Sequence, residues 1–308
     1  LAVWLGAFWL LCLGTLVAGV YNAAGAYYRF AAADTAGTEF KSKAISLVMA
    51  GGIVGGVIGP ETSKLTRELL PVTYLGTYLS LIAFALVAMA ILRWIDIPRL
   101  SEHEREESGR PLAAIMAQPV FVVAVISAMV GYGVMNLLMT ATPIAMTHHH
   151  HHHYDDAAFV LEWHVIGMFL PSFFTGSLIK RFGVLQVMLA GAVLMFLCIG
   201  FALSGTGLAN FWIALVLLGV GWNFLFIGGT TLLTEAYTPP EKAKTQGIND
   251  LLVFLTMATS SFSSGALVTS TGWDALNWWS LPFLVATMLA TLWLLVQRRL
   301  APTPQVGA

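Results

Sequence analysis

Apolar stretches of about 20 residues, almost free of charge, recur along this chain and constrain its fold more than any other feature. A helix of that length crosses a hydrocarbon core of roughly 30 Å. Helices are expected because a segment in lipid must satisfy its own backbone hydrogen bonds. Only 10% of the 308 residues are charged, against roughly 25% in an average soluble domain. We therefore predict an all-α, polytopic membrane helix bundle.

Breaks between the apolar stretches define nine predicted transmembrane helices. They cover residues 2–27, 44–60, 72–92, 120–146, 157–179, 184–203, 211–233, 248–269 and 279–296. Of the 15 Lys and Arg residues, only Lys64 and Arg67 lie in one alternate set of loops. Because basic residues stay on the cytoplasmic side, we predict a multi-pass protein of the cytoplasmic (inner) membrane with its C-terminus in the cytoplasm.

The longest polar segment divides the chain unevenly. It contains IDIPRLSEHEREESGRP, whose mixed charges are typical of a solvated linker. A faint repeat, TAGTEFKSKA before the second span and TPPEKAKTQG before the eighth, agrees with two parallel halves. We predict a partial N-terminal bundle of three spans at 1–92, a cytoplasmic linker at 93–118, a complete six-helix bundle at 119–297 and a cytoplasmic tail at 298–308.

Glycines recur at every fourth residue of the second span, in two neighbouring stripes: Gly51, Gly55 and Gly59, and beside them Gly52 and Gly56. Such stripes let the backbone of another helix approach closely. Pro60 follows and is expected to end or kink the span. A generic close contact between helices would explain the pattern as well as a functional motif.

Two motifs indicate a family. The segment from Gly55 to Pro60 fits the GxxxGP core of the fifth-helix motif of major facilitator antiporters. In GSLIKRFG, Gly176, Arg181 and Gly183 fit the GxLaDrxGrr pattern that joins two helices in the same superfamily, although a plain basic turn would also explain this loop. On these residues the chain resembles the major facilitator superfamily, in particular its bacterial drug or metabolite:proton antiporters.

The resemblance implies a fold of two helical bundles that rock about a site at the membrane midplane. It also implies twelve helices, of which this chain would hold helices 4–12 and lack the front of its N-terminal half. The first, fourth and seventh spans of this chain would then line the central cavity.

Polar and aromatic residues near the middle of these spans are the predicted solute contacts. Tyr132, Asn136 and Thr140 share one helix face. An amide in hydrocarbon is costly unless paired, and amides beside aromatic rings suit a neutral or aromatic solute. Either asparagine could instead bond another helix. The predicted contacts are Tyr132, Asn136, Thr140, Trp222, Asn223 and Phe226, with Tyr21 and Asn22 as further candidates.

Ionisable residues inside spans mark proton or substrate paths by default. Glu162 and His164 on the fifth span and Asp250 at the inner end of the eighth are the predicted proton-coupling groups. A snorkelling position for Glu162 and a helix N-terminal role for Asp250 are the alternatives. Arg29 is interpreted as a cytoplasmic anchor.

Six consecutive histidines, His148 to His153, lie in a predicted outer loop. They are typical of a metal-binding loop or of an affinity tag, and their spacing defines no tetrahedral site. We therefore predict no metal and no cofactor.

We predict a secondary active transporter of a small organic solute that works by alternating access as a monomer, with proton coupling and export. The chain has no GxxxxGK[ST] motif and no catalytic carboxylate pair, which argues against ATP-driven transport and an enzyme. Its net charge of -1 argues against nucleic acid as a partner. The alternatives are a nutrient or vitamin importer, acting as a facilitator or symporter, and a non-transporting receptor or enzyme.

Overall fold

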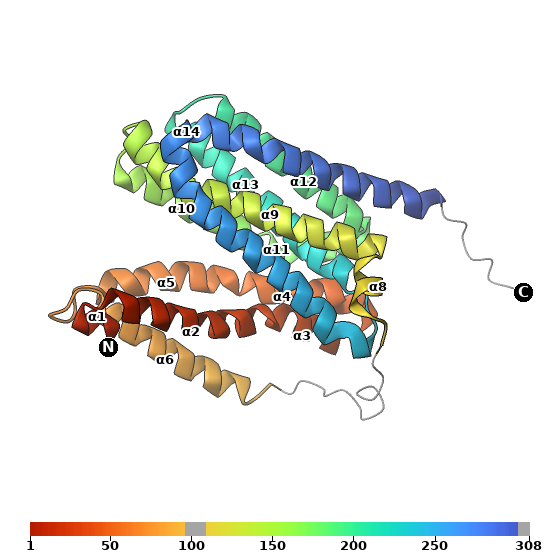
Figure 1. Cartoon of the computed structure of the whole chain (residues 1–308), viewed down its shortest axis with the longest axis horizontal. Helices are drawn as coiled ribbons and strands as arrows, with labels where there is room; N and C mark the ends of the chain where they lie inside the picture. The colour runs from red at the N-terminus through yellow and green to blue at the C-terminus, as the bar shows by residue number, and fades with distance from the viewer. Residues whose placement is uncertain (96–108, 301–308) are drawn as a thin grey trace, which may run out of the picture.

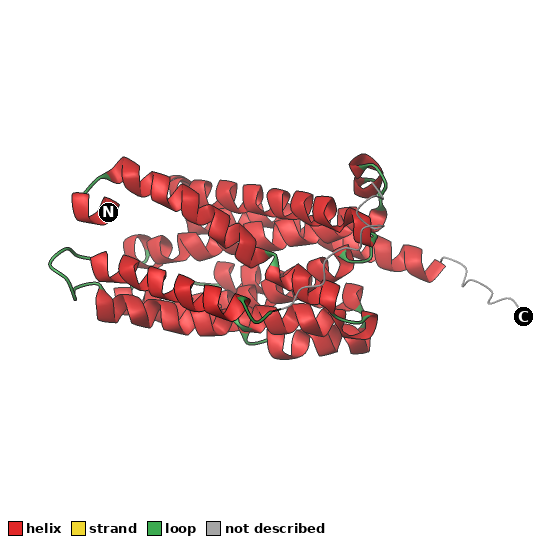
Figure 2. Cartoon of the chain, turned by 90° about the horizontal axis from the view of Figure 1, so that it is seen from below, coloured by secondary structure: helices red, strands yellow, loops and turns green. Residues whose placement is uncertain are grey.

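The structure is a computed structural model that describes residues 1–95 and 109–300. Within these ranges the chain forms helices and no strands, and the long helices run roughly side by side (Figures 1 and 2). The first residue and the end of the last helix lie at opposite ends of the bundle (Figure 1). This is the arrangement expected of an odd number of spans.

Residues 1–95 form the first helix group, at the bottom of Figure 1. Two of its long apolar segments, Phe8–Thr35 and Thr38–Thr66, are each built from consecutive helices. Its elements are α1 (Ala2–Leu5), α2 (Phe8–Ala26), α3 (Tyr28–Thr35), the short helix η1 (Thr38–Phe40), α4 (Lys41–Ala50), α5 (Gly52–Thr66) and α6 (Leu75–Leu92).

Residues 109–300 form the second helix group, which contains most of the buried apolar side chains. Its core includes Met188, Leu218 and Trp222, each at most 1% exposed. Its elements are α8 (Leu112–Met116), α9 (Pro119–Ile144), η2 (Ala145–His149), α10 (Tyr154–Phe169), α11 (Ser172–Phe182), α12 (Val184–Leu203), α13 (Leu208–Leu233), η3 (Pro239–Glu241) and α14 (Lys242–Leu300).

The described residues contain seven helices long and apolar enough to cross a membrane, or eight if the bent pair α10 and α11 counts as one span. One of the seven, Pro239–Leu300, is 62 residues long. It is interrupted at Gly272, where φ is 83° and ψ is 173°, so that α14 consists of two arms. With α10 and α11 counted as one span and the two arms of α14 as two, each of the nine predicted spans corresponds to a helical segment.

The predicted span boundaries differ from the helices at two places in the first group. The span expected to end at residue 27 continues as α3 to Thr35, and α5 continues past Pro60 to Thr66. Residues 96–108 of the predicted linker and 301–308 of the predicted tail lie outside the described residues. The predicted domain limits themselves stay predictions.

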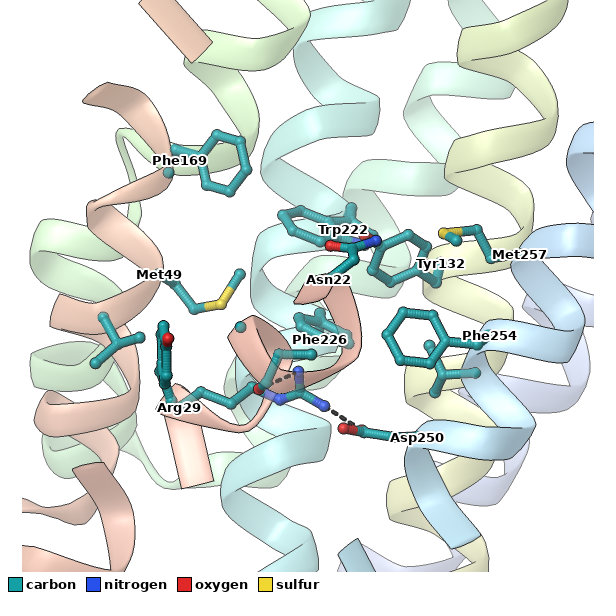
Figure 3. A pocket seen from close by; sticks show the side chains of 16 residues that line it. Asn22, Arg29, Met49, Tyr132, Phe169, Trp222, Phe226, Asp250, Phe254 and Met257 are labelled. Atoms are coloured by element: carbon teal, nitrogen blue, oxygen red, sulfur yellow. Dashed lines mark hydrogen bonds and ion pairs between the residues drawn. The ribbon is translucent and has the colours of Figure 1, made fainter. Parts of the chain in front are cut away.

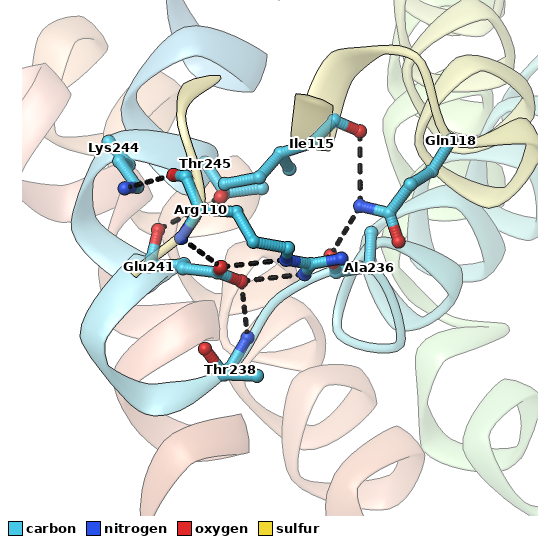
Figure 4. A network of polar contacts seen from close by, with 8 residues as sticks. All are labelled: Arg110, Ile115, Gln118, Ala236, Thr238, Glu241, Lys244 and Thr245. Carbon is cyan, nitrogen blue, oxygen red and sulfur yellow. Dashed lines mark hydrogen bonds and ion pairs between the residues drawn. The ribbon is translucent and has the colours of Figure 1, made fainter. Parts of the chain in front are cut away.

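Within the predicted linker, Arg110 holds the described residues against the second helix group (Figure 4). Its Nε and Nη2 atoms donate to the two carboxylate oxygens of Glu241 at 2.7 and 2.6 Å, and its backbone N–H donates to Oε1 at 2.7 Å. These hydrogen bonds raise the pKa of Arg110 above its ordinary value. Glu241 also accepts the backbone N–H of Thr238. Arg110 therefore attaches this segment to η3, directly before α14 begins.

Candidate functional site

A cavity of about 280 Å³ lies where the two helix groups meet (Figure 3). Helices α2 to α5 of the first group and α9, α10, α13 and α14 of the second group contribute to its wall. The lining residues are Asn22, Gly25, Ala26, Tyr28, Arg29, Val48, Met49, Gly52, Tyr132, Phe169, Trp222, Phe226, Asp250, Val253, Phe254 and Met257.

Aromatic rings form one wall of the cavity. Trp222 and Phe226, one turn apart on α13, are stacked with their centroids 5.2 Å apart. Tyr132 of α9 meets both edge-on, at 5.4 and 5.2 Å, and Phe169 meets Trp222 at 5.8 Å. These contacts hold the rings in fixed orientations and make this wall of the cavity rigid and apolar.

A buried ion pair forms the polar end of the cavity. Arg29 of α3 donates to Asp250 Oδ1 of α14, and both side chains are 6% exposed. The guanidinium lies 4.5 Å from the ring centroid of Phe30 and 4.8 Å from that of Phe226. Its Nη1 donates to the carbonyl of Ala26 at 2.9 Å. Arg29 is therefore fixed in position, and it links the two helix groups.

Three polar atoms in the cavity wall have no hydrogen-bond partner within the described residues. They are Nε of Arg29, Oδ2 of Asp250 and Nε1 of Trp222, and all three are buried. Oδ1 of Asp250, by contrast, accepts from both Arg29 and Asn249. A buried polar group without a partner costs about 1–3 kcal/mol. The residues of the cavity wall therefore hold two donors and one acceptor that no protein group satisfies.

Five of the candidate residues predicted from the sequence line this cavity: Asn22, Tyr132, Trp222, Phe226 and Asp250. Asn136 and Thr140 are on the same helix as Tyr132 but are not among the lining residues. Asn136 instead donates to the carbonyl of Met257 and to Ser260 Oγ, at 3.2 and 3.0 Å. It joins α9 to α14.

Asn223 also bonds neighbouring helices. Its Nδ2 donates to the carbonyl of Met168 and to Ser172 Oγ, both at 2.6 Å, and its Oδ1 accepts from Thr175 Oγ at 2.7 Å. The side chain is completely buried, on the helix that carries Trp222 but outside the cavity.

The predicted acid and base on α10 lie away from the cavity. Glu162 is exposed. His164 is completely buried inside the second group, with Nδ1 2.7 Å from the carbonyl oxygen of Leu215. No cluster of three His, Cys, Asp or Glu side chains suited to a metal is found in the described part of the chain, which includes the six-histidine run.

The glycine stripe that touches the second group is Gly52 and Gly56. A Cβ atom on these residues would lie 2.3 Å from Phe169 and 2.5 Å from Val165. A Cβ atom on Gly55 or Gly59 would meet nothing within 4 Å, and one on Gly51 would meet only a carbonyl of its own segment. The stripe that carries the family motif, Gly51, Gly55 and Gly59, therefore lies beside the stripe that makes the close contact.

The GSLIKRFG segment, at the end of α11, meets α4 of the first group. The backbone N–H of Gly176 donates to Ser46 Oγ, its carbonyl accepts from Ser42 Oγ, and Ser46 also donates to the carbonyl of Ser172. A Cβ on Gly176 would lie 2.6 Å from the Cα of Lys43. The segment therefore forms part of the contact between the two groups.

The other residues of this motif lie beside that contact. Lys180 pairs with Glu39 of the first group at 2.7 Å. Arg181 lies 5.2 Å from the ring centroid of Phe182, and Gly183 ends α11 with a φ of 94°. Hydrogen bonds and ion pairs between the groups thus involve residues 29–46 and 172–250, on the side of the bundle where α8 lies (Figure 1).

Arg29, interpreted from the sequence as a cytoplasmic anchor, is instead a buried charged residue of the cavity wall. The spacing of the residues nevertheless indicated that Arg29 belongs to the cavity. Asn22 and Arg29 are seven residues apart, which places them on one face of a helix, and both line the cavity. Phe169, Phe254 and Met257 are large apolar residues within apolar spans, where nothing distinguishes a cavity wall from a core.

Comparisons with known proteins agree with this geometry. A family model described as Major Facilitator Superfamily matches residues 123–308. A riboflavin transporter, RfnT, of Brucella anthropi is 41% identical over 293 residues, which are 94% of this chain and 73% of that protein. The uncharacterised transporter YdeG of Bacillus subtilis is 29% identical over 301 residues, 90% of this chain and 68% of the relative.

A solved structure shares the fold. The crystal structure of a bacterial homologue of the iron transporter ferroportin, in an outward-facing state, superimposes with a TM-score of 0.63 at 13% sequence identity. The match covers 85% of this chain and 65% of that one. Family model, relatives and fold agree with the two sequence motifs, and the chain therefore belongs to the Major Facilitator Superfamily of membrane transporters.

Proposed function

We propose that this protein imports riboflavin, or a vitamin with a similarly flat and polar ring system, through the cavity between its helix groups. The observation that carries the proposal is the rigid aromatic wall of Tyr132, Trp222 and Phe226 beside the Arg29–Asp250 pair. Apolar pockets with a few fixed polar groups bind such ligands well. The 41% identity to a riboflavin transporter supports the same substrate class.

The transport cycle would open and close the cavity by rocking the two groups against each other. Breaking the contacts of Gly176 with Ser42 and Ser46, and the Arg29–Asp250 pair, would open the side of the bundle where α8 lies. We place that side in the cytoplasm of an inner-membrane protein, from the distribution of its basic residues. The protein would act as a monomer.

Uptake by cells that cannot synthesise riboflavin tests the proposal. Cells that produce the protein should grow at lower external riboflavin than cells with an empty vector and should accumulate labelled riboflavin. Trp222→Ala, which removes the centre of the aromatic wall, should abolish the gain. The control Trp94→Ala changes an 86% exposed tryptophan outside the cavity and should retain it. Equal growth with and without the wild-type protein would disprove riboflavin import.

Proton-coupled export is the second candidate, and the buried carboxylate of Asp250 in the cavity wall favours it. Glu162 and His164 stay candidates for coupling only if another conformation brings them to the cavity. An imposed pH gradient separates the possibilities. Accumulation in right-side-out vesicles that ignores the gradient removes proton coupling, and accumulation only in inverted vesicles identifies export.

A further inference from the structure

Resting on the proposed function, we propose that the polar end of the cavity recognises the imide edge of the substrate ring, with Asp250 Oδ2 accepting a hydrogen bond from the imide N–H. Arg29 Nε would donate to the adjacent ring carbonyl. This assigns to two residues a role in specificity, and it fixes which end of the ring system points toward α3 and α14.

The unpaired atoms carry the inference. Asp250 Oδ2 and Arg29 Nε belong to the two partners of one ion pair in the cavity wall, and neither atom has a hydrogen-bond partner within the described residues. A ligand that satisfies both must present a donor next to an acceptor. Amide, lactam and imide edges have that pattern, whereas a hydrocarbon edge or a phosphate, which offers acceptors alone, does not.

The pair is held in one arrangement before a ligand binds. Two aromatic rings flank the guanidinium, and the carbonyl of Ala26 holds Nη1. Asn249 and Arg29 together occupy Oδ1 of Asp250. Only Oδ2 is therefore left to accept, and little conformational freedom is lost when a ligand uses it.

Riboflavin fits this pattern at one edge of its ring system only. Its pyrimidine ring carries an imide N–H between two carbonyl groups, whereas the opposite edge carries two methyl groups. With the imide at Arg29 and Asp250, the ring system would extend along the wall formed by Tyr132 and Trp222 (Figure 3). The unpaired Nε1 of Trp222 would donate to an acceptor further along the ring.

Binding of riboflavin and 3-methylriboflavin tests the assignment, because the methyl group replaces the imide hydrogen. Quenching of flavin fluorescence by the purified protein in lipid nanodiscs gives both dissociation constants. A hydrogen bond to a charged group predicts that riboflavin binds about tenfold to a hundredfold more tightly than 3-methylriboflavin. Equal affinities would overturn the imide assignment alone. No binding of riboflavin to the wild-type protein would overturn the proposed function as well.

Asp250→Asn separates the hydrogen bond from a steric effect of the methyl group. The variant keeps the shape of the side chain but weakens the acceptor, so the ratio of the two dissociation constants should fall to about threefold or less. An unchanged ratio would mean that the methyl group merely clashes, and would overturn the role of Asp250. Asp274→Asn, the same change at an exposed residue, is the control and should keep the wild-type ratio.

If Asp250→Asn does not fold, the double variant Arg29→Met/Asp250→Leu replaces it. Removing both charges leaves no uncompensated ion in the protein. The double variant should bind both ligands weakly and with nearly equal affinity. A retained preference for riboflavin in this background would overturn the inference.

Discussion

Two buried asparagines inside the second helix group differ from the buried ion pair at the junction of the two groups. Asn223 makes three hydrogen bonds to its neighbours on α10 and α11, and Asn136 makes two to α14. At the junction, Arg29 and Asp250 pair with each other but each keeps an unpaired polar atom. Protein groups satisfy both asparagines, whereas the ion pair in the cavity wall is only partly satisfied, as are His164 Nε2 and Asn277 Oδ1 elsewhere in the second group.

The two helix groups also differ in their cores. In the second group, 61% of the most apolar window of Pro119–His149 and 67% of that of Leu208–Leu233 is buried, against 0% for Phe8–Thr35 and 6% for Leu75–Leu92 in the first. The helices of the second group pack mainly against one another. Variants at the junction should change transport as well as stability, while variants inside the second group should change stability alone.

The largest expected effect is that of Arg29→Leu. It leaves the carboxylate of Asp250 buried without an opposite charge, which should destabilise the protein by about 3–5 kcal/mol and abolish transport. Thermal unfolding in detergent and cellular uptake measure the two effects. Arg29→Met/Asp250→Leu should recover most of the stability without recovering transport. Recovery of both would show that the ion pair has no part in substrate binding.

Asn223→Leu should destabilise the second group by about 2–3 kcal/mol, because Thr175 and Ser172 lose a buried partner. Flavin affinity of the fraction that stays folded should be unchanged, since Asn223 does not line the cavity. Asn136→Leu, with fewer bonds, should cost less. A folded Asn223→Leu protein with reduced affinity would place Asn223 with the binding residues.

Gly176→Ala should cost about 1–3 kcal/mol, because its Cβ would lie 2.6 Å from the backbone of Lys43 and Ser42. Since the clash lies between the groups, the added methyl group should also shift the protein toward conformations in which they separate. Thermal unfolding measures the cost. Labelling of Ser46→Cys, with and without the alanine, measures the separation.

Gly200→Ala is the matched control for Gly176→Ala, because nothing lies within 4 Å of a Cβ at that position in α12. Alanine has the higher helix propensity, so this variant should be neutral or slightly stabilised. If both alanine variants change the free energy of unfolding equally, the contact of Gly176 with α4 does not contribute to stability.

The sequence predicted the helical segments because length and apolar character depend on the bilayer, not on tertiary contacts. It also predicted Tyr132, Trp222, Phe226 and Asp250 as site candidates, and all four line the cavity. It could not separate Trp222 from Asn223, its neighbour on α13. Which of two adjacent residues faces the cavity depends on the rotation of the helix, and that is decided by packing.

Arg29 shows a second limit of the sequence. A basic residue two positions beyond a predicted span is normally an anchor at the membrane surface. Here α3 continues the helical segment to Thr35, and a carboxylate 221 positions later in the chain compensates the charge. Such a distant pairing leaves no local pattern. For the same reason the sequence does not tell which glycine stripe of α4 and α5 makes the close contact, because the two stripes differ only once a partner helix is in place.

The smallest expected effect is that of Glu39→Gln. Glu39 and Lys180 connect the two groups at 2.7 Å, but their side chains are 86% and 52% exposed. Water and salt screen such a pair, so neither the melting temperature nor uptake should change measurably. Asp34→Asn is the comparison, because Asp34 contacts Lys242 and Gln246 across the same junction and is only 20% exposed. Its effect should be larger than that of Glu39→Gln and smaller than that of Arg29→Leu. If Glu39→Gln slows uptake as much as Asp34→Asn does, then proximity across the junction, rather than burial, determines which charges transport depends on.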